Sequence, residues 1–256
     1  MSSNHSEINV LEFENQGLGD RHIATEIADL LKQRQAEGKM AVLGLATGSS
    51  VLGVYKELIR MHKEEGLSFK NAITFNLDEY YPINKDHKQS YHTYMSEKLF
   101  SQVDILPENT HLPDGTETDK DKEVLCKEYE DKIAQAGGID LQLLGIGRNG
   151  HIGFNEPGSS IESETRLIEL DSVTRNDAAP AFGGLENTPT HAITMGVASI
   201  LRAKKIILMA WSTNKASIIA KVIKSEPTSD IPATFLKTVA NVTFVLDKEA
   251  ASEIGK

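Results

Sequence analysis

The sequence has a single cysteine, Cys126, among its 256 residues, and this scarcity excludes a framework of internal disulfides. No Cys and His residues have the spacing of a structural zinc site. No window approaches the roughly 18 consecutive apolar residues of a membrane span, and no basic segment followed by an apolar stretch opens the chain. These absences predict a cytoplasmic protein of a reducing compartment, with no membrane association and no metal.

Positive charge is also in short supply. The chain carries 27 Lys and Arg against 37 Asp and Glu, a net charge of −10. A general nucleic-acid binder needs the opposite balance, because basic side chains must displace counterions from the phosphate backbone. We therefore expect no nucleic-acid partner, and any anionic ligand must be bound by a few local donors.

The apolar share, 39% before glycine is counted, is close to that of an ordinary globular chain, and short apolar runs alternate with helical periods along its whole length. These runs are typical of buried parallel strands, since both of their faces are apolar. They are Met40–Leu45, Ala72–Asn76, Leu141–Gly145, Lys205–Trp211 and Val242–Leu246. This pattern predicts one α/β domain over residues 1–256, with an open, mainly parallel sheet and helices on both of its faces.

Three segments between these runs have apolar residues at helical spacing. The predicted stripes are Ile23, Ile27, Leu30 and Leu31; Leu52, Tyr55, Leu58 and Ile59; and Val124, Leu125, Tyr129 and Ile133. Cys126 lies beside the third stripe, and neither a second cysteine nor a basic residue is placed to lower its pKa. It is expected to be a structural thiol.

Ligands of open α/β sheets bind beyond the carboxyl ends of the strands. Four predicted strands are followed there by polar segments, which begin at Ala46, Leu77, Ile146 and Ser212. The topology is expected to bring these segments to one edge of the sheet.

The first of these segments, Thr47-Gly48-Ser49-Ser50, joins a buried strand to a helix that starts near Val51. Free backbone N–H groups, hydroxyls and the positive end of the helix dipole could together hold a phosphate group. The alternative is a plain helix cap by Ser49 or Ser50, and the loop alone does not decide between the two.

Residues Gly145 to Gly150 match the dinucleotide-binding pattern G-x-G-x-x-G and follow a strand. That function needs a helix immediately afterwards, but Pro157-Gly158 interrupts the segment before a helix can support a pyrophosphate. We therefore do not expect this loop to bind a dinucleotide.

The same loop places His151 close in sequence to Asn149 and Glu156. Histidine exchanges protons near neutral pH, and a neighbouring amide or carboxylate can fix its tautomer and orientation. The pair Asp78-Glu79 follows another strand, and because adjacent side chains of an extended segment point to opposite sides, at most one of its carboxylates should face a cleft.

Lys215 and Arg175 are candidate cationic partners for a phosphate. Together the candidates make a phosphate cradle, two cations, a carboxylate and an oriented histidine, which suits proton transfer on a phosphorylated small molecule. The residues alone leave isomerase, lactonase and deaminase open.

From about Val10 to Ala251 the sequence resembles the glucosamine-6-phosphate deaminase family, also called glucosamine-6-phosphate isomerases. The segments that carry the resemblance are LGLATG from Leu43, NLDEY from Asn76 and above all GIGRNGHIGFNEP from Gly145 to Pro157. It implies conversion of D-glucosamine 6-phosphate and water to D-fructose 6-phosphate and ammonia in amino sugar catabolism, without a cofactor. It also implies a fold shared with 6-phosphogluconolactonases.

The resemblance further implies the roles of individual residues. Asp78 would move the proton between C2 and C1, and His151 would open the sugar ring, oriented by Asn149 and Glu156. The 6-phosphate would be bound by Thr47, Gly48, Ser49, Ser50, Arg175 and Lys215. A segment of about residues 155–184 would form a lid over the sugar, either hinged at Phe182-Gly183-Gly184 or a plain flexible loop.

The sequence departs from the family at Asn149, where many members have Asp, and at Ile168 and Glu169, where members activated by N-acetylglucosamine 6-phosphate have a basic residue and a Thr. We therefore expect weak or absent allosteric activation, and a homo-oligomer stays open. Two alternative functions remain: a 6-phosphogluconolactonase-like hydrolase, and a sugar-phosphate-sensing module without catalysis.

Overall fold

The computed structural model describes residues 8–116 and 120–255. Its strands are β1 (Asn9–Phe13), β2 (Ala41–Leu45), β3 (Ala72–Asn76), β4 (Asp78–Tyr81), β5 (Thr110–His111), β6 (Leu141–Leu144), β7 (Arg166–Glu169), β8 (His191–Thr194), β9 (Ile206–Ala210) and β10 (Val242–Asp247). Its α-helices are α1 (Gln16–Ala36), α2 (Leu52–Glu65), α3 (Tyr91–Lys98), α4 (Lys122–Gln135), α5 (Ser172–Phe182), α6 (Val197–Leu201), α7 (Ala216–Lys224) and α8 (Lys248–Ala251). Every strand predicted from an apolar run is present, with ends that differ by a residue at most.

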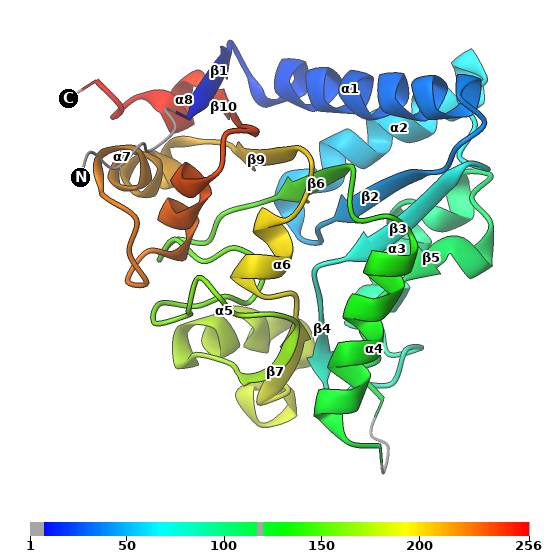
Figure 1. The fold of residues 1–256 in the computed structure, drawn as a ribbon. Coiled ribbons are helices and arrows are strands. Elements are labelled where there is room, and N and C mark those ends of the chain that lie inside the picture. Colours follow the sequence, from blue (N-terminus) through cyan, green and yellow to red (C-terminus); the bar gives the residue numbers. More distant parts are fainter. Residues whose placement is uncertain (1–7, 117–119, 256) are drawn as a thin grey trace.

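Seven strands form a parallel sheet in the order β1-β10-β9-β6-β2-β3-β5. The chain builds outward from β2 to β3 and β5, and then returns to place β6 on the other side of β2 (Figure 1). The strand order therefore reverses between β2 and β6. The loops after these two strands separate at that point and leave room for a ligand.

Helices cover both faces of this sheet, as predicted. Helices α1 and α2 pack on one face with the core residues Ile23, Ile27, Tyr55 and Leu58, whereas α4, α6 and α7 cover the other. All five residues of β2 and of β9 are buried, which explains why their sequences are apolar without alternation.

A second, antiparallel sheet of order β4-β8-β7 was not among the predicted elements. Figure 1 shows it with α5 below the main sheet, where β4 continues the chain beyond β3. An aromatic cluster of Tyr80, Tyr91, Phe154 and Phe182 packs beside it. This small sheet carries Asp78 as the first residue of β4.

The predicted lid segment, residues 155–184, contains a strand, β7, and a helix, α5, so it is not a plain flexible loop.

The prediction for the third helical stripe was wrong at Val124, whose side chain is 46% exposed. Helix α4 turns its Cys126 and Tyr129 inward, and Val124 lies about 200° around the helix from Cys126. Cys126 is a buried free thiol, as expected of a structural cysteine.

Among the described residues, no helix combines the length and the apolar character that crossing a membrane requires.

Candidate active site

A cavity of about 570 Å³ opens at the carboxyl ends of β2, β3, β6 and β9, and we call it the strand-end cavity. Its lining includes seven predicted site residues: Thr47, Gly48, Ser49, Ser50, Asp78, His151 and Lys215. Segments separated by more than 160 positions in the sequence thus meet at one edge of the sheet, as the parallel topology predicts.

The loop after β2 presents unpaired backbone donors to this cavity. Gly48 has φ 96°, a conformation that glycine adopts without strain, and the turn leads into a 3-10 helix, η1 (Ser49–Val51). In the described part of the chain, the backbone N–H groups of Thr47, Gly48, Ser49 and Ser50 have no acceptor, and no side chain caps η1. The plain helix cap is therefore not what these serines form, and an anion would satisfy the free donors.

Lys215 reaches the cavity from the loop after β9. It ends the short helix η5 (Thr213–Lys215), and its Nζ donates to the backbone carbonyl of Ile146 at 2.7 Å. The turn before it is built on Ser212, whose positive φ of 72° is held by hydrogen bonds from its N–H to both carboxylate oxygens of Asp247, each 3.0 Å. Burial, and secondly the charge of Arg148, lower the pKa of Lys215.

The neighbours Asp78 and Glu79 point to opposite sides of β4, as predicted. Glu79 turns away from the cavity and accepts backbone N–H groups of Tyr80, Tyr91 and His92 at 2.9–3.0 Å. Asp78 lines the cavity and has no hydrogen-bond donor among the described residues. Burial first, and the charge of Glu79 second, raise the pKa of Asp78 to about 8, so this carboxyl exchanges its proton near neutral pH.

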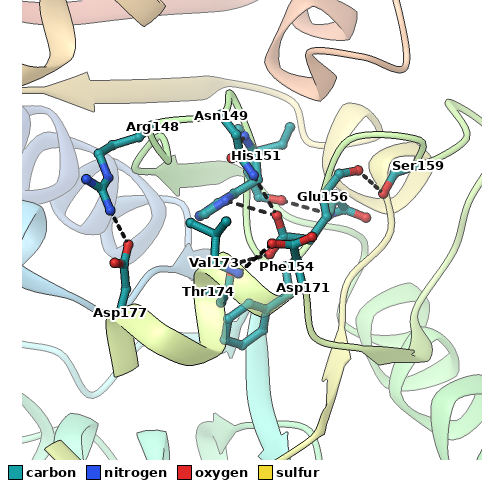
Figure 2. Close-up of polar contacts among 12 residues, drawn as sticks. Arg148, Asn149, His151, Phe154, Glu156, Ser159, Asp171, Val173, Thr174 and Asp177 are labelled. Atoms are coloured by element: carbon teal, nitrogen blue, oxygen red, sulfur yellow. Dashed lines mark hydrogen bonds and ion pairs between the residues drawn. The ribbon is translucent and has the colours of Figure 1, made fainter. Parts of the chain in front are cut away.

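His151 is held by the loop around it (Figure 2). Its Nδ1 lies 3.4 Å from Oε2 of Glu156, an ion-pair distance rather than a short hydrogen bond. Asn149 donates from Nδ2 to the same Glu156 oxygen at 2.8 Å, and its Oδ1 accepts the backbone N–H of His151 at 3.2 Å. The hydroxyl of Thr174 donates to the other oxygen of Glu156.

This network keeps Glu156 charged. Burial alone would raise the pKa of Glu156, but the nearby His151 imidazole and the hydrogen bonds from Thr174 and Asn149 outweigh it, and the net effect is a lowered pKa. A carboxylate on Nδ1 leaves Nε2 as the nitrogen that can face a substrate.

Gly147 explains why the histidine loop needs glycine. A Cβ at this position would lie 2.2 Å from Cε1 of His151, so the imidazole packs directly against the Gly147 backbone. Gly147 of the G-x-G-x-x-G match therefore makes room for a histidine, and in the described chain no helix follows the match before α5.

Arg175 does not reach the strand-end cavity, contrary to prediction. Its guanidinium donates to the backbone carbonyls of Leu185, Thr188 and Pro189 at 3.1–3.3 Å, on the far side of α5. The reason is helical geometry: Thr174, Asp177 and Ala178 share the face of α5 that lines the cavity, and residue 175 is rotated about 100° from residue 174.

Sequence reasoning missed Arg148 and the aromatic wall of the cavity, which is formed by Tyr80, Tyr91 and Phe154. Arg148 pairs with Asp177 of α5 at 2.6 Å, and Figure 2 shows the two side chains pointing toward one another. Both residues line the strand-end cavity. The signal for Arg148 in the sequence was its position in the G-x-G-x-x-G match, which follows a predicted strand.

A larger cavity, about 850 Å³, lies between α4, α6 and β7. It contains none of the predicted site residues, and its central carboxylate, Glu130, is already bonded by Thr165, Ser199 and Arg202. Within the ranges that the structure describes, no three His, Cys, Asp or Glu side chains are grouped so that they could share a metal ion. The chemistry of the fold therefore concentrates at the strand-end cavity.

Comparison with known proteins identifies a family. The profile of glucosamine-6-phosphate isomerases/6-phosphogluconolactonase matches residues 19–245. The glucosamine-6-phosphate deaminase of Thermoanaerobacter pseudethanolicus is 48% identical over 232 residues, which are 91% of each chain. That of Bacillus pumilus is 45% identical over 245 residues, 96% of this chain and 99% of the relative.

Solved structures agree. A monomeric glucosamine-6-phosphate deaminase superposes with a TM-score of 0.91 at 40% identity, over 96% of this chain and 100% of the other. The 6-phosphogluconolactonase of Trypanosoma brucei superposes with a TM-score of 0.76 at 20% identity, over 97% of this chain and 99% of the other, a likeness of fold alone.

Proposed function

The chain belongs to the family of glucosamine-6-phosphate isomerases and 6-phosphogluconolactonases, and we propose that it is a glucosamine-6-phosphate deaminase. The reaction converts D-glucosamine 6-phosphate and water to D-fructose 6-phosphate and ammonia. One observation carries the proposal beyond the family: an unpaired carboxyl, Asp78, and an oriented imidazole, His151, face the same cavity as a loop of free N–H donors.

The phosphate is assigned to the loop from Thr47 to Ser50, together with Lys215. The free N–H groups and the ammonium provide several charge-assisted hydrogen bonds to a dianion. The 6-phosphate is remote from the reacting carbons, so its binding energy serves to hold C1 and C2 against the base.

The proton transfers are assigned to two groups. His151, oriented by Glu156 and Asn149, opens the sugar ring by moving a proton between the ring oxygen and the C1 hydroxyl. Asp78 then takes the proton from C2 and returns it to C1, which turns the aldose into an imine of the ketose. Water adds to C2, and ammonia leaves as the carbonyl forms.

The single-domain organisation with a lid over residues 155–184, a cytoplasmic site of action and a place in amino sugar catabolism are parts of the same proposal. The lid is supported by the position of α5, whose Thr174, Asp177 and Ala178 close one side of the cavity. The cytoplasmic location is supported by the free thiol of Cys126.

The direct test is an assay of the purified protein with glucosamine 6-phosphate, following fructose 6-phosphate and ammonia together. We expect equal amounts of both products, and Asp78→Asn should lower turnover at least ~100-fold while sugar-phosphate binding is kept. Faster hydrolysis of 6-phosphogluconolactone would favour the lactonase instead. Saturable binding without any product would favour the sensing module.

A further inference from the structure

The carbonyl groups of the phosphate loop are bound by aromatic side chains. The hydroxyl of Tyr55 donates to the carbonyl of Ala46 at 2.6 Å, and the hydroxyl of Tyr94 donates to that of Gly48 at 2.7 Å. The indole Nε1 of Trp211 donates to the carbonyl of Ser50 at 2.8 Å. Every second carbonyl from residue 46 to residue 50 thus has an aromatic donor.

These donors come from three different elements and from one side. Tyr55 lies on α2, Tyr94 on α3, and Trp211 directly after β9. Residues 46–51 all line the strand-end cavity, whereas none of the three aromatic residues does. The aromatic donors therefore approach the loop from behind, on the side away from the cavity.

Peptide geometry converts this arrangement into a direction for the loop donors. A peptide group is planar and trans, so the N–H of one residue points opposite to the carbonyl of the residue before it. Fixing the carbonyls of Ala46 and Gly48 from behind turns the N–H groups of Thr47 and Ser49 toward the cavity. Those N–H groups are among the ones without an acceptor in the described structure.

We propose that Tyr55 and Tyr94 are positioning residues that orient the peptide groups after Ala46 and Gly48 for binding the substrate phosphate, and that Trp211, which holds the carbonyl of Ser50, fixes the end of the same loop. The inference rests on the proposed function. The ring of Trp211 is itself tightly packed, since a Cβ added at Gly19 of α1 would lie 2.5 Å from its Cη2. Tyr55 is fully buried, and burial raises the pKa of Tyr55 and of Tyr94, so both hydroxyls stay protonated and donate.

Tyr94→Phe is the leading variant because it removes one hydroxyl and keeps the ring. Its loss of a single hydrogen bond should weaken binding of inorganic phosphate about fivefold and raise KM for glucosamine 6-phosphate by the same factor. Turnover at saturation should stay within about twofold, because no group near the reacting carbons changes. Trp211→Phe removes the indole donor and should act in the same direction.

Tyr129→Phe is the matched control. The Tyr129 hydroxyl is buried and donates to a backbone carbonyl, that of Asn76, at 2.7 Å, but it lies outside the phosphate loop. Its loss should lower the melting temperature as the other substitutions do and leave phosphate affinity unchanged.

Phosphate affinity is measured by calorimetry, and the amide resonances of Thr47 and Ser49 are followed by NMR during the phosphate titration. In the native chain both resonances should shift on titration. The proposal is overturned if Tyr94→Phe and Trp211→Phe bind phosphate as tightly as the native chain, or if Tyr129→Phe weakens binding equally. It also fails if the native chain binds no phosphate.

These binding measurements need no turnover, so they separate the two proposals. If the variants bind phosphate more weakly and the native chain releases no ammonia from glucosamine 6-phosphate, the positioning role is supported and the deaminase is refuted. If the native chain deaminates glucosamine 6-phosphate and the variants keep the native phosphate affinity, the deaminase is supported and the positioning role is refuted.

Discussion

At the scale of single residues, the site depends on two adjacent carboxyls that the fold treats differently. Glu79 is surrounded by backbone N–H donors, which offset part of its burial, and its pKa is raised to about 7. Asp78 has no such donors and faces the cavity, and its pKa is raised to about 8. A base that accepts a proton from carbon needs such a raised pKa, but an unsupported buried carboxyl destabilises the fold.

Asp78→Asn should therefore stabilise the protein while it lowers turnover at least ~100-fold. Because the pKa of Asp78 is raised on folding, the native state holds a proton that the unfolded chain releases, and stability falls as pH rises from about 4 to about 8. The uncharged asparagine side chain of Asp78→Asn avoids this loss of stability. We expect the free energy of unfolding at pH 8 to rise by at least about 1 kcal/mol, with a difference that shrinks toward pH 4.

Asp140→Asn gives the opposite sign and serves as the control in the same urea titrations. Burial alone would raise the pKa of Asp140, but Lys204, the Val42 N–H and Arg34 outweigh it and lower it. The stability that the charged carboxylate of Asp140 contributes is present at neutral pH and is lost as pH falls through its lowered pKa. Asp140→Asn should thus be destabilising at pH 7. Equal destabilisation by both variants would contradict the account of Asp78.

At the scale of elements, the main sheet could be predicted because its strands are buried on both faces. Runs such as Ala41–Leu45 and Ile206–Ala210 contain no polar side chain, and that signal survives in a single sequence. The small sheet gives no such signal. Its strand β7, Arg166–Glu169, is short and only half-buried, and β4 carries two acidic residues, so burial by tertiary contacts decides its conformation.

The part of the candidate site that follows the main strands could also be predicted, whereas the part on helix α5 could not. Residues directly after the main strands, such as Asp78, His151 and Lys215, reach the cavity because parallel strands all end at one edge. Arg175 lies on a helix that the sequence did not reveal, since Pro180 and small residues weaken the helical pattern of α5. Without the helix, the rotation that carries Arg175 away from the cavity could not be foreseen.

Arg175→Ala and Lys215→Ala should separate the two cations that the sequence placed together. Arg175 bonds three carbonyls of one segment, so its loss should lower the free energy of unfolding by ~1–3 kcal/mol and leave KM for glucosamine 6-phosphate within about threefold. Lys215→Ala should raise KM at least about tenfold, because it removes a half-buried charge from the phosphate. Steady-state kinetics and thermal melts of both variants decide. A larger KM for Arg175→Ala than for Lys215→Ala would restore Arg175 as the phosphate ligand.

At the scale of the whole molecule, an anionic substrate must reach a site in a chain whose net charge is −10. The overall field opposes the approach of a phosphate, so affinity depends on donors gathered at one point. The topology provides this: the loop after β2, the loop after β6 and Lys215 after β9 all converge on the reversal of strand order. Local donors in a buried cavity are screened little by solvent and act against a repulsive background.

Among the described residues of β7, two are unfavourable for binding a second sugar phosphate. Where activated relatives are expected to carry a basic residue and a Thr, this chain has Ile168 and the exposed Glu169, whose carboxylate repels a phosphate. Arg166 is already bonded to Asn155 Oδ1 at 2.9 Å and to Ser159 Oγ at 3.3 Å. We therefore expect hyperbolic kinetics, and N-acetylglucosamine 6-phosphate should leave the half-saturating concentration of glucosamine 6-phosphate unchanged. Initial rates over a substrate series, with and without this compound, test the expectation. A large drop in the half-saturating concentration would show that these residues bind an activator despite the unfavourable charge.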